Sequence, residues 1–374
     1  MTPPLNEKLE KVEWGEFKLG DLFNKIVQGR RLTKEDQISG SIPFVMAGIT
    51  NTGVVNYISN PVTSFPKNSI TIDIFGNTFY RNYAFGAGDD TGVYWNNEKN
   101  YSQSVMLFFS IAIQKSLSGK FSYGKKLRSS QSLNLKIQLP VKNNKIDFEF
   151  MEGFIAELEV ERLSELEAYL NISGLKDYIL TKEEEEILDN YKNIEWGEFK
   201  LEVLFEKIKT KKLSFKADEL PKQMIGEYTL PCLTSSFQNQ GLNYFVPKDE
   251  ATILKNVISI PSNSDIYRAY FQSNEFTVLS DAYAIRWIFD GIKLLPSQYL
   301  FAVQCINKVT DLPIYSYKNK LGGWNVVKNK CVQLPIKNDI PDYEIMKTLI
   351  SAIQKLVIKE LVLYTDKKQT VITI

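Results

Sequence analysis

The heptapeptide EWGEFKL occurs twice in this chain of 374 residues, at positions 13–19 and again at 195–201. A chance repeat of seven residues that include a tryptophan is very improbable, so the two copies indicate an internal duplication. Further similar blocks follow each copy in the same order: GDLFNKI and EVLFEKI, IPFVMAGITNTGVVNYI and LPCLTSSFQNQGLNYFV, NSITI and NVISI, FYRNYAF and IYRAYFQ, YGKKL and YKNKL, IQLPV and VQLPI, DFEFM and DYEIM. The offset grows only between blocks, as it does when loops lengthen. The chain therefore contains two similar units of about 180–195 residues, far longer than a solenoid repeat.

The composition is that of an ordinary globular protein, with 44% hydrophobic and 24% charged residues. No apolar run approaches the roughly 18 residues of a membrane span, and the polar N-terminal segment does not resemble a secretory signal. Three widely spaced cysteines, Cys232, Cys305 and Cys331, fit reduced thiols in a cytoplasmic protein better than a disulfide framework. The chain has no histidine. This excludes a Ser/His/Asp or Cys/His relay, a histidine-ligated zinc and an imidazole base.

The charge is unevenly distributed, although the net charge is only +1. Residues 17–145 hold about 16 Lys/Arg against 7 Asp/Glu, and residues 199–338 about 18 against 12. Between them, residues 147–195 hold about 4 against 15. Two basic modules therefore flank an acidic connector, a distribution that suits binding of a polyanion by the modules. We expect the acidic run 183–186 to face solvent or a basic partner surface.

Within each module the sequence predicts short strands between turn signals, and hence a mixed α and β fold. KLGDLF and KLEVLF are expected to close a strand or to open a short helix. The predicted strands are 69–75, 93–95 and 104–109 in the first module, and 257–260, 284–289 and 331–334 in the second. The resulting domain prediction is 1–146 and 193–338 for the two modules, with helical spacers at 147–192 and 339–374.

Each module ends on QLP and is followed by an amphipathic helical pattern of about 23 residues, with Asp147 and Asp342 as predicted N-caps. A lone helix of this kind cannot bury its apolar stripe, so we predict that the two helices pack as an antiparallel pair. The alternative is that each helix covers the sheet of its own module. The residues predicted to form the helix pair are Met151, Ile155, Leu158, Leu166, Met346, Ile350, Ile353, Val357 and Leu361.

Basic, aromatic and amide-bearing residues recur at corresponding places in the two modules. Arg, Lys, Gln and Asn side chains can bond base edges in the major groove, whereas Ser, Lys and Tyr commonly hold phosphates. Any one of these residues could be an ordinary surface side chain, and it is their recurrence that favours DNA binding. The predicted DNA-binding residues are Gln28, Arg30, Arg31, Lys34, Tyr80, Arg81, Lys125, Lys126, Arg128, Ser129 and Gln131 in the first module, and Lys209, Lys211, Lys212, Tyr267, Arg268, Lys318, Lys320 and Trp324 in the second.

From Trp14 to about Tyr364 the chain resembles the DNA specificity subunit of a type I restriction-modification system, or the related specificity chain of type IIB enzymes. The resemblance rests on duplicated modules that open with WGEFKLxxLF, close on QLP and are followed by D-[FY]-E-[FI]-M helices. It implies two target recognition domains, each reading one half of a split DNA site, and an antiparallel coiled coil with pseudo-twofold symmetry between them. It also implies that this chain is not the catalyst and binds no cofactor.

The resemblance further implies partners. Methyltransferase subunits would dock on the helices and bring the S-adenosylmethionine chemistry, and a separate or fused restriction subunit would cut. A helix of about 23 residues is about 35 Å long, near one turn of B-form DNA. We therefore expect half-sites of about 3–4 base pairs separated by roughly 5–8. The repeated heptapeptide would belong to the scaffold, with Trp14, Trp196, Phe17 and Phe199 partly buried where each module's edge meets a helix.

Two other classes of function stay open from the residues alone. A duplicated protein-interaction scaffold could use the same aromatic loops to bind peptides, and would then show no salt-sensitive affinity for DNA. An enzyme with carboxylate-bound metal, for instance a nuclease that uses Asp73 or Asp281, would cleave or modify DNA as an isolated chain.

Overall fold

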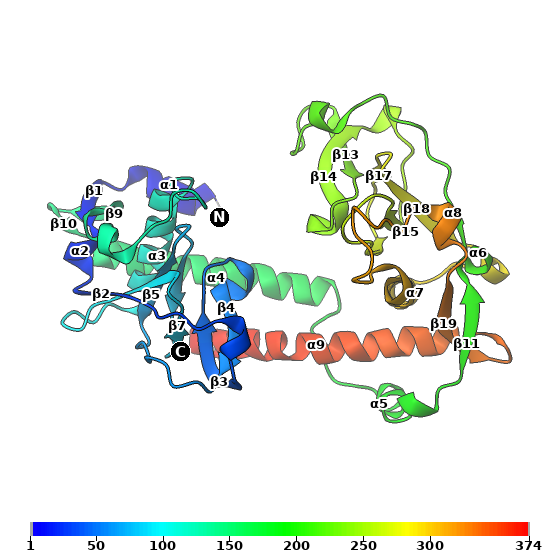
Figure 1. Ribbon diagram of the computed structural model, residues 1–374, viewed down its shortest axis with the longest axis horizontal. Coiled ribbons are helices and arrows are strands. Elements are labelled where there is room, and N and C mark those ends of the chain that lie inside the picture. The colour runs from blue at the N-terminus through cyan, green and yellow to red at the C-terminus, as the bar shows by residue number, and fades with distance from the viewer. Residues whose placement is uncertain (1–2, 373–374) are drawn as a thin grey trace. The chain divides into compact units, whose positions relative to one another are not determined.

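The computed structural model describes residues 3–372, with side chains for 5–368, and divides into two compact units. Unit 1 ends at Ala168 and unit 2 begins at Tyr169, so the boundary lies in the last turns of a long helix, α4 (Figure 1). The predicted mixed α/β architecture of two similar units, each followed by a long helix, is confirmed.

Unit 1 contains three small sheets and one central helix. Its elements are α1 Pro3–Lys11, β1 Trp14–Lys18, α2 Leu19–Leu22, β2 Lys25–Gln28, η1 Lys34–Asp36, β3 Ser39–Val45, η2 Thr50–Gly53, β4 Val54–Ile58, β5 Ser69–Asp73, β6 Thr78–Arg81, β7 Gly86–Ala87, β8 Thr91–Trp95, α3 Gln103–Leu117, η3 Ser129–Asn134, β9 Lys136–Lys142, β10 Lys145–Ile146 and α4 Phe148–Ile172. The strand orders are β2-β8-β5-β6, β4-β3-β7 and β1-β9-β10.

Unit 2 repeats this plan strand for strand. Its elements are α5 Lys182–Asp189, η4 Tyr191–Asn193, β11 Trp196–Lys200, α6 Leu201–Leu204, β12 Phe205–Lys207, η5 Ala217–Glu219, β13 Tyr228–Leu233, η6 Gln238–Gly241, β14 Leu242–Pro247, η7 Lys248–Glu250, β15 Val257–Pro261, β16 Tyr270–Gln272, β17 Thr277–Val278, β18 Ala282–Trp287, η8 Phe289–Gly291, α7 Pro296–Thr310, α8 Trp324–Val327, β19 Cys331–Lys337, β20 Ile340–Pro341 and α9 Tyr343–Ile372. The strand orders are β12-β18-β15-β16, β14-β13-β17 and β11-β19-β20.

The two repeated sequence signatures of each unit, WGEFK and QLP, pair with each other. β1 is antiparallel to β9, with Trp14 opposite Pro140 and Phe17 opposite Ile137. β11 and β19 have the same register, with Trp196 opposite Pro335. The heptapeptide and the tripeptide therefore recur together because they form one ladder that joins the beginning of a unit to its end.

The glycine of WGEFK is required by the packing over this ladder. A Cβ atom on Gly15 would lie 2.6 Å from Cγ1 of Val141, and one on Gly197 would lie 2.6 Å from Cγ2 of Ile336. The residue that follows QLP on the same strand thus places a branched side chain directly over the glycine in both units. On the same strands, the Trp14 ring stacks on Phe108 of α3 and the Trp196 ring on Phe301 of α7. The expectation that each tryptophan lies where the module's edge meets a helix is confirmed, although Trp14 keeps 41% of its surface exposed.

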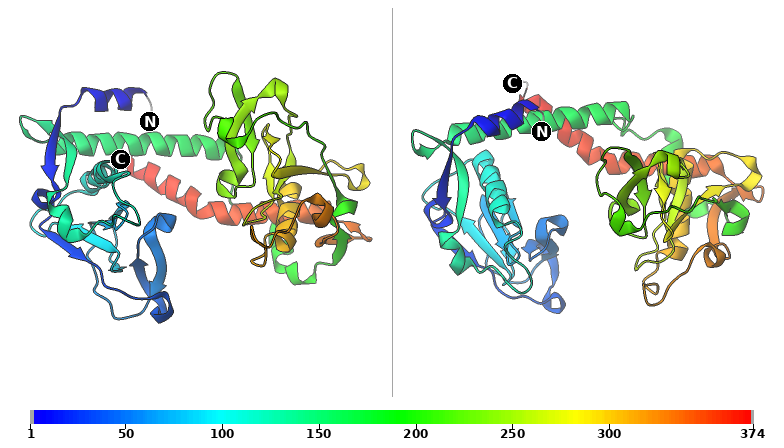
Figure 2. Two further views of the ribbon diagram at one scale, coloured as in Figure 1. Left: turned by 45° about the horizontal axis from the view of Figure 1, so that its top comes forward. Right: turned by 90° about the horizontal axis from the view of Figure 1, so that it is seen from above.

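Residues 104–109 form a helix, so the prediction of a strand there was wrong. Ser102 caps α3 by accepting a hydrogen bond from the Val105 N–H, and both Met106 and Phe109 are buried. A continuous apolar run carries no period, so its length and its cap decide the structure. α3 packs on β5, β6 and β9, and α7 takes the same place on β15, β16 and β19 (Figure 2).

The long helices begin at the predicted caps. The Asp147 Oδ1 atom accepts from the Phe150 N–H, and the Asp342 Oδ1 atom accepts from the N–H groups of Glu344 and Ile345. The first turns of each helix then pack on their own unit. Met151 and Ile155 lie in the core with α3, and Met346 and Ile350 in the core with α7. Assigning these four residues to a helix pair was therefore wrong, because the short β10 and β20 connections direct each helix across its own module first.

The later residues of the predicted stripe differ in exposure. Leu158 and Leu166 are half-buried, whereas Ile353, Val357 and Leu361 are 47%, 75% and 38% exposed. An antiparallel pairing of the two helices stays a prediction.

The acidic run of the connector is part of the folded unit 2. Thr181 and Glu184 form a capping box at the start of α5, and α5 packs beside α9 (Figure 1). The Glu184 side chain is 5% exposed, so the expectation that residues 183–186 all face solvent or a partner was wrong at this position. Burial is possible because Ser351 and Lys355 of α9 donate hydrogen bonds to its carboxylate.

Candidate nucleic-acid interface

Two segments of unit 1 that carry predicted site residues, 28–34 and 123–131, converge beside a third, the turn between β7 and β8. The Arg30 N–H donates to the Ala87 carbonyl, and the Leu127 N–H donates to the carbonyl of Ile74 at the end of β5. Gln28 joins the segments, because its amide donates to the Asp89 carbonyl and accepts from the Ser129 N–H. Since both ends of its amide are engaged, Gln28 positions the loops. We call the three segments, 28–34, 87–92 and 123–131, the basic loops of unit 1.

The cations of these loops form no ion pairs in the part of the chain that the structure describes. Arg30, Arg31, Lys34, Lys125 and Arg128 are all exposed, and none forms an ion pair with another residue among 3–372. By contrast, Arg286 is paired with Glu206, Arg162 with Glu165 and Arg268 with Asp311. Unpaired cations gathered on one face create the positive potential that attracts an anionic ligand.

Arg30 and Arg31 also border a cavity of about 340 Å³. Its remaining walls are Leu32, Ala87 and residues 60–63. The Asn60 side chain holds the wall in place, because its amide accepts from the Ile38 N–H and donates to the Asp36 carbonyl. The cavity therefore combines two arginines with a partly apolar wall, and arginine suits a base edge that presents two acceptors, as guanine does in the major groove.

A lysine-on-tyrosine turn recurs in both units. The Lys126 amine lies 4.6 Å from the centre of the Tyr123 ring, and the Lys320 amine lies 4.6 Å from that of Tyr317. A buried leucine follows each turn, Leu127 in one unit and Leu321 in the other. The alignment of YGKKL with YKNKL is thus confirmed at the level of side chains. Both tyrosines are largely exposed, so each turn presents a cation and an aromatic face to solvent.

The basic loops of unit 2 are built from lysines. Lys209, Lys211, Lys212 and Lys318 are exposed and have no ion-pair partner in the described part of the chain. Arg268 differs, since its Nε atom lies 2.7 Å from the Asp311 carboxylate, which also raises the pKa of the guanidinium. Its charge is already compensated.

Arg81 and Tyr267 cannot contact DNA in this structure, and predicting them as binding residues was wrong. Each is 1% exposed. The Arg81 guanidinium donates to Thr71, Tyr83 and the Thr52 carbonyl, and so holds the tight turn between β3 and β4. Its role is to support the scaffold. Tyr80, its half-buried neighbour, donates to Asn68.

The alignment of Tyr80–Arg81 with Tyr267–Arg268 was also wrong. Strand pairing places Arg81 opposite Ser69 and Gln272 opposite Val257. The Gln272 amide donates to Ser259 and to the carbonyl of Gln240, as Arg81 donates to Thr71 and to that of Thr52. Gln272 is therefore the counterpart of Arg81, and the similarity of the YRNY and YRAY tetrapeptides is coincidental.

Residues that sequence reasoning missed line a second cavity, of about 240 Å³, in unit 2. Lys207, Ser262 and Tyr283 lie there together with the predicted residue Trp324, whose ring centroid is 6.3 Å from that of Tyr283. These residues come from four separate segments, so no local pattern groups them. Lys207 stands in a repeated block and is aligned with Lys25, and this alignment was the only sequence feature that could have pointed to the cavity.

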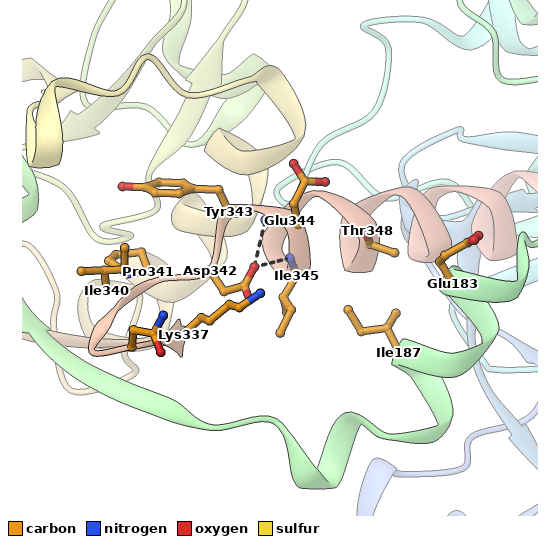
Figure 3. A pocket seen from close by; sticks show the side chains of 11 residues that line it. Glu183, Ile187, Lys337, Ile340, Pro341, Asp342, Tyr343, Glu344, Ile345 and Thr348 are labelled. Atoms are coloured by element: carbon orange, nitrogen blue, oxygen red, sulfur yellow. Dashed lines mark hydrogen bonds between the residues drawn. The ribbon is translucent and has the colours of Figure 1, made fainter.

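A third cavity of about 510 Å³ lies in unit 2 between α5, the β19–β20 turn and the first turn of α9 (Figure 3). Ile187, Ile340 and Ile345 supply an apolar wall, and Glu183 and Glu344 stand at its rim. The paired N–H bonds to Asp342 that start α9 are drawn there. Its carboxylates make it a poor place for a phosphate.

The carboxylates considered for metal chemistry have structural partners. Asp73 accepts from the N–H groups of Gly48, Phe75 and Asn77, and Asp281 accepts from the N–H and hydroxyl of Ser235. Within residues 3–372, no three His, Cys, Asp or Glu side chains are grouped so that they could hold a metal ion. In the same part of the chain, none of the helices is long and apolar enough to cross a membrane.

Comparison with known proteins relates unit 1 to a described family. Residues 11–168 match the type I restriction modification DNA specificity domain. Over 169 residues the chain is 33% identical to the specificity subunit of the type II restriction enzyme BgcI from Heyndrickxia coagulans. That similarity covers 43% of this chain and 48% of the relative, so the chain spans about half the length of the curated protein it matches.

Two solved structures of similar size were compared with the whole chain. The S subunit of a type I restriction-modification system from M. genitalium superposes with a TM-score of 0.49 at 17% identity, over 97% of this chain and 94% of that one. The HsdS subunit from Thermoanaerobacter tengcongensis gives a TM-score of 0.31 at 11% identity, over 95% of this chain and 91% of that one.

Proposed function

We propose that this chain reads DNA sequence for a restriction-modification complex, because residues 11–168 match the type I restriction modification DNA specificity domain. The observation that carries the proposal is the set of exposed cations without ion pairs on the basic loops of unit 1, two of which, Arg30 and Arg31, line a cavity. Double-stranded DNA is a dense polyanion. Cations that contact its phosphates release bound counter-ions, and this release favours binding.

Unit 2 has the same strand plan as unit 1 and carries its own exposed lysines in the corresponding loops. We therefore propose that each unit reads one half of a two-part site. The two half-sites would differ in sequence, because arginines border the cavity of unit 1, whereas lysines and a tryptophan occupy the loops of unit 2. Arginine bonds the O6 and N7 atoms of guanine with two parallel hydrogen bonds, which lysine cannot reproduce. A guanine in the half-site of unit 1 is the expected result.

Partner subunits complete the proposal. The α9 helix leaves Ile353, Val357 and Leu361 exposed, and exposed apolar rows of this kind mark surfaces that another helix or another protein covers. We propose that the long helices form a spacer on which methyltransferase subunits dock, and that those subunits supply S-adenosylmethionine and the catalytic residues.

The test is a selection from a random duplex library at about 0.15 M salt, first with the full chain and then with the methyltransferase added. The expected result is a two-part motif with a fixed gap of roughly 5–8 base pairs, given half-sites about one helical turn apart. A single ungapped motif would contradict the two-reader proposal. Salt-insensitive association without any DNA preference would instead favour a protein-interaction scaffold.

A further inference from the structure

The two units differ at one equivalent place beside the central sheet. The Ile74 N–H donates to the Asp90 carbonyl in unit 1, and the Ser262 N–H donates to the Asp281 carbonyl in unit 2. Two residues after each aspartate stand Gly92 and Tyr283. In unit 1 the η3 segment closes over this strand, because a Cβ on Gly92 would lie 3.1 Å from the Cβ of Ser129. In unit 2 the same region contains the cavity of about 240 Å³.

The walls of this cavity are rich in hydrogen-bond donors. Lys207, Ser262, Ser280 and Asn325 line it, and no carboxylate does. In the described part of the chain, none of these four side chains has a hydrogen-bond or ion-pair partner; the Lys207 amine only lies over the Tyr283 ring, 5.5 Å from its centre. Four polar residues from different segments thus border one small space, and Lys207 is the one charged residue among those that line it.

Two buried side-chain atoms beside the cavity, the Tyr283 hydroxyl and Oδ1 of Asp281, also lack hydrogen-bond partners among residues 3–372. The Tyr283 side chain is 3% exposed, and its hydroxyl has no hydrogen-bond partner among residues 3–372. Burial raises the pKa of this phenol, so it keeps its proton and can only donate to an anion. The neighbouring carboxylate, Asp281, directs its Oδ2 atom to Ser235 and does not line the cavity. A polar side chain that is buried without a partner costs free energy, so the Tyr283 hydroxyl is a donor held in reserve beside the cavity and not part of its open wall.

We propose that this cavity of unit 2 holds one phosphate group of the DNA backbone, and so fixes the register in which unit 2 meets its half-site. Phosphate oxygens are acceptors only, and they match walls made of donors and one ammonium group. A base edge is a poorer fit, since each base pair presents donors as well as acceptors. The inference rests on the proposed function, because it takes the anion from DNA.

The test combines a phosphate scan with variants of the cavity. Duplexes that carry the selected site are made with one methylphosphonate at each position in turn, which removes a single backbone charge. For the full-length wild-type chain, one position next to the half-site of unit 2 is expected to lower affinity about 10-fold, the scale of one charged hydrogen bond. Lys207→Met and Ser262→Ala are each expected to lower the affinity for the unmodified duplex by a similar factor. In these variants, the methylphosphonate at that one position should cause no further loss of affinity.

Lys293→Met is the matched control, because Lys293 is an exposed lysine of unit 2 that does not line the cavity. It should leave the whole scan unchanged. If the loss of binding free energy caused by Lys207→Met simply adds to the loss caused by the methylphosphonate at every position of the scan, the proposal is overturned. So would tight binding of inorganic phosphate, followed by Trp324 fluorescence, in a protein whose DNA scan shows no coupled position. If library selection finds no preferred sequence at all, the proposed function itself is wrong; a preferred sequence without a coupled phosphate removes only this assignment.

Discussion

Glu184 and Lys355, which are 171 residues apart in the sequence, are joined by a hydrogen bond of 3.0 Å between Oε2 and Nζ in the interior of unit 2. The same carboxylate accepts from the N–H of Thr181 and from the hydroxyl of Ser351. One side chain therefore caps α5 and fastens that helix to α9.

Replacing Glu184 with alanine should destabilise unit 2 by about 3 kcal/mol. The change removes the main partner of the Lys355 charge and breaks the capping box of α5. Urea denaturation of the full chain measures the loss. Glu185→Ala is the control, since Glu185 is exposed on the same helix and should change stability by less than about 0.5 kcal/mol. Equal losses for the two variants would show that the interior contacts of Glu184 contribute nothing.

The contribution of this pair should also depend on pH. Burial raises the pKa of Glu184, but hydrogen bonds from Ser351, Thr181 and Lys355 outweigh burial and hold it below its ordinary value of 4.5. For Lys355, the hydrogen bond to Glu184 and the charges of Glu184 and Asp177 raise the amine pKa above 10.5.

The stabilisation is therefore fully present between these two ordinary values. It is lost as pH falls through the lowered carboxyl pKa or rises through the raised amine pKa. The difference in urea midpoint between wild type and Glu184→Gln should be the same at about pH 6 and about pH 9, and should shrink near pH 4 and below. A difference that widened in acid would reverse the expected sign.

Gly15→Ala and Gly197→Ala should each destabilise their own unit by about 1–3 kcal/mol, because the new methyl group overlaps Val141 or Ile336. Combining Gly15→Ala with Val141→Ala should recover part of the loss. Gly153→Ala is the control: nothing lies within 4 Å of its Cβ position on α4, so alanine should be neutral or stabilising there. Thermal unfolding of the full chain compares the variants.

Arg81→Met should destabilise unit 1 by about 3 kcal/mol, because several acceptors of a buried guanidinium lose their donor. Arg31→Met, at an exposed position, should change stability by less than about 0.5 kcal/mol. Urea denaturation separates them. If Arg81→Met kept wild-type stability but lost affinity for DNA, Arg81 would have to reach the ligand after all.

Arg30→Ala and Arg31→Ala should weaken DNA binding by the full chain without affecting its stability. Each phosphate contact that is lost lowers the slope of log affinity against log salt by about 0.9. Arg30→Lys distinguishes the two kinds of contact, because it keeps a phosphate contact but not a bidentate bond to guanine. Arg162→Ala, which removes an ion-paired arginine of α4, is the control in a fluorescence anisotropy titration. An unchanged affinity for both Arg30→Ala and Arg31→Ala would remove the basic loops from the interface.

Sequence reasoning succeeded wherever a pattern was both local and repeated. The duplication, the helix caps Asp147 and Asp342 and the alignment of YGKKL with YKNKL all depend on short segments that occur twice. It failed where tertiary packing decides the outcome. The apolar run before Phe109 has no period. The tetrapeptide YRAY around Arg268 is similar to YRNY around Arg81, but the two arginines occupy different places in the fold.

Burial was the other property that sequence could not supply. Arg81 and Glu184 are charged residue types that usually lie on the surface, and each is buried because partners from distant segments satisfy it. The Lys207 cavity escaped notice for a related reason, since its walls come from four separate stretches of chain.

The ladder between the repeated heptapeptide and the QLP strand has a consequence for how the protein is made. β1 of unit 1 pairs with β9, and β11 of unit 2 pairs with β19, so neither ladder can form until most of the unit has left the ribosome. Contacts between such distant segments carry a high entropic cost of loop closure and slow the folding of a domain. The residues that open each repeat are therefore synthesised first and are among the last to find their partners.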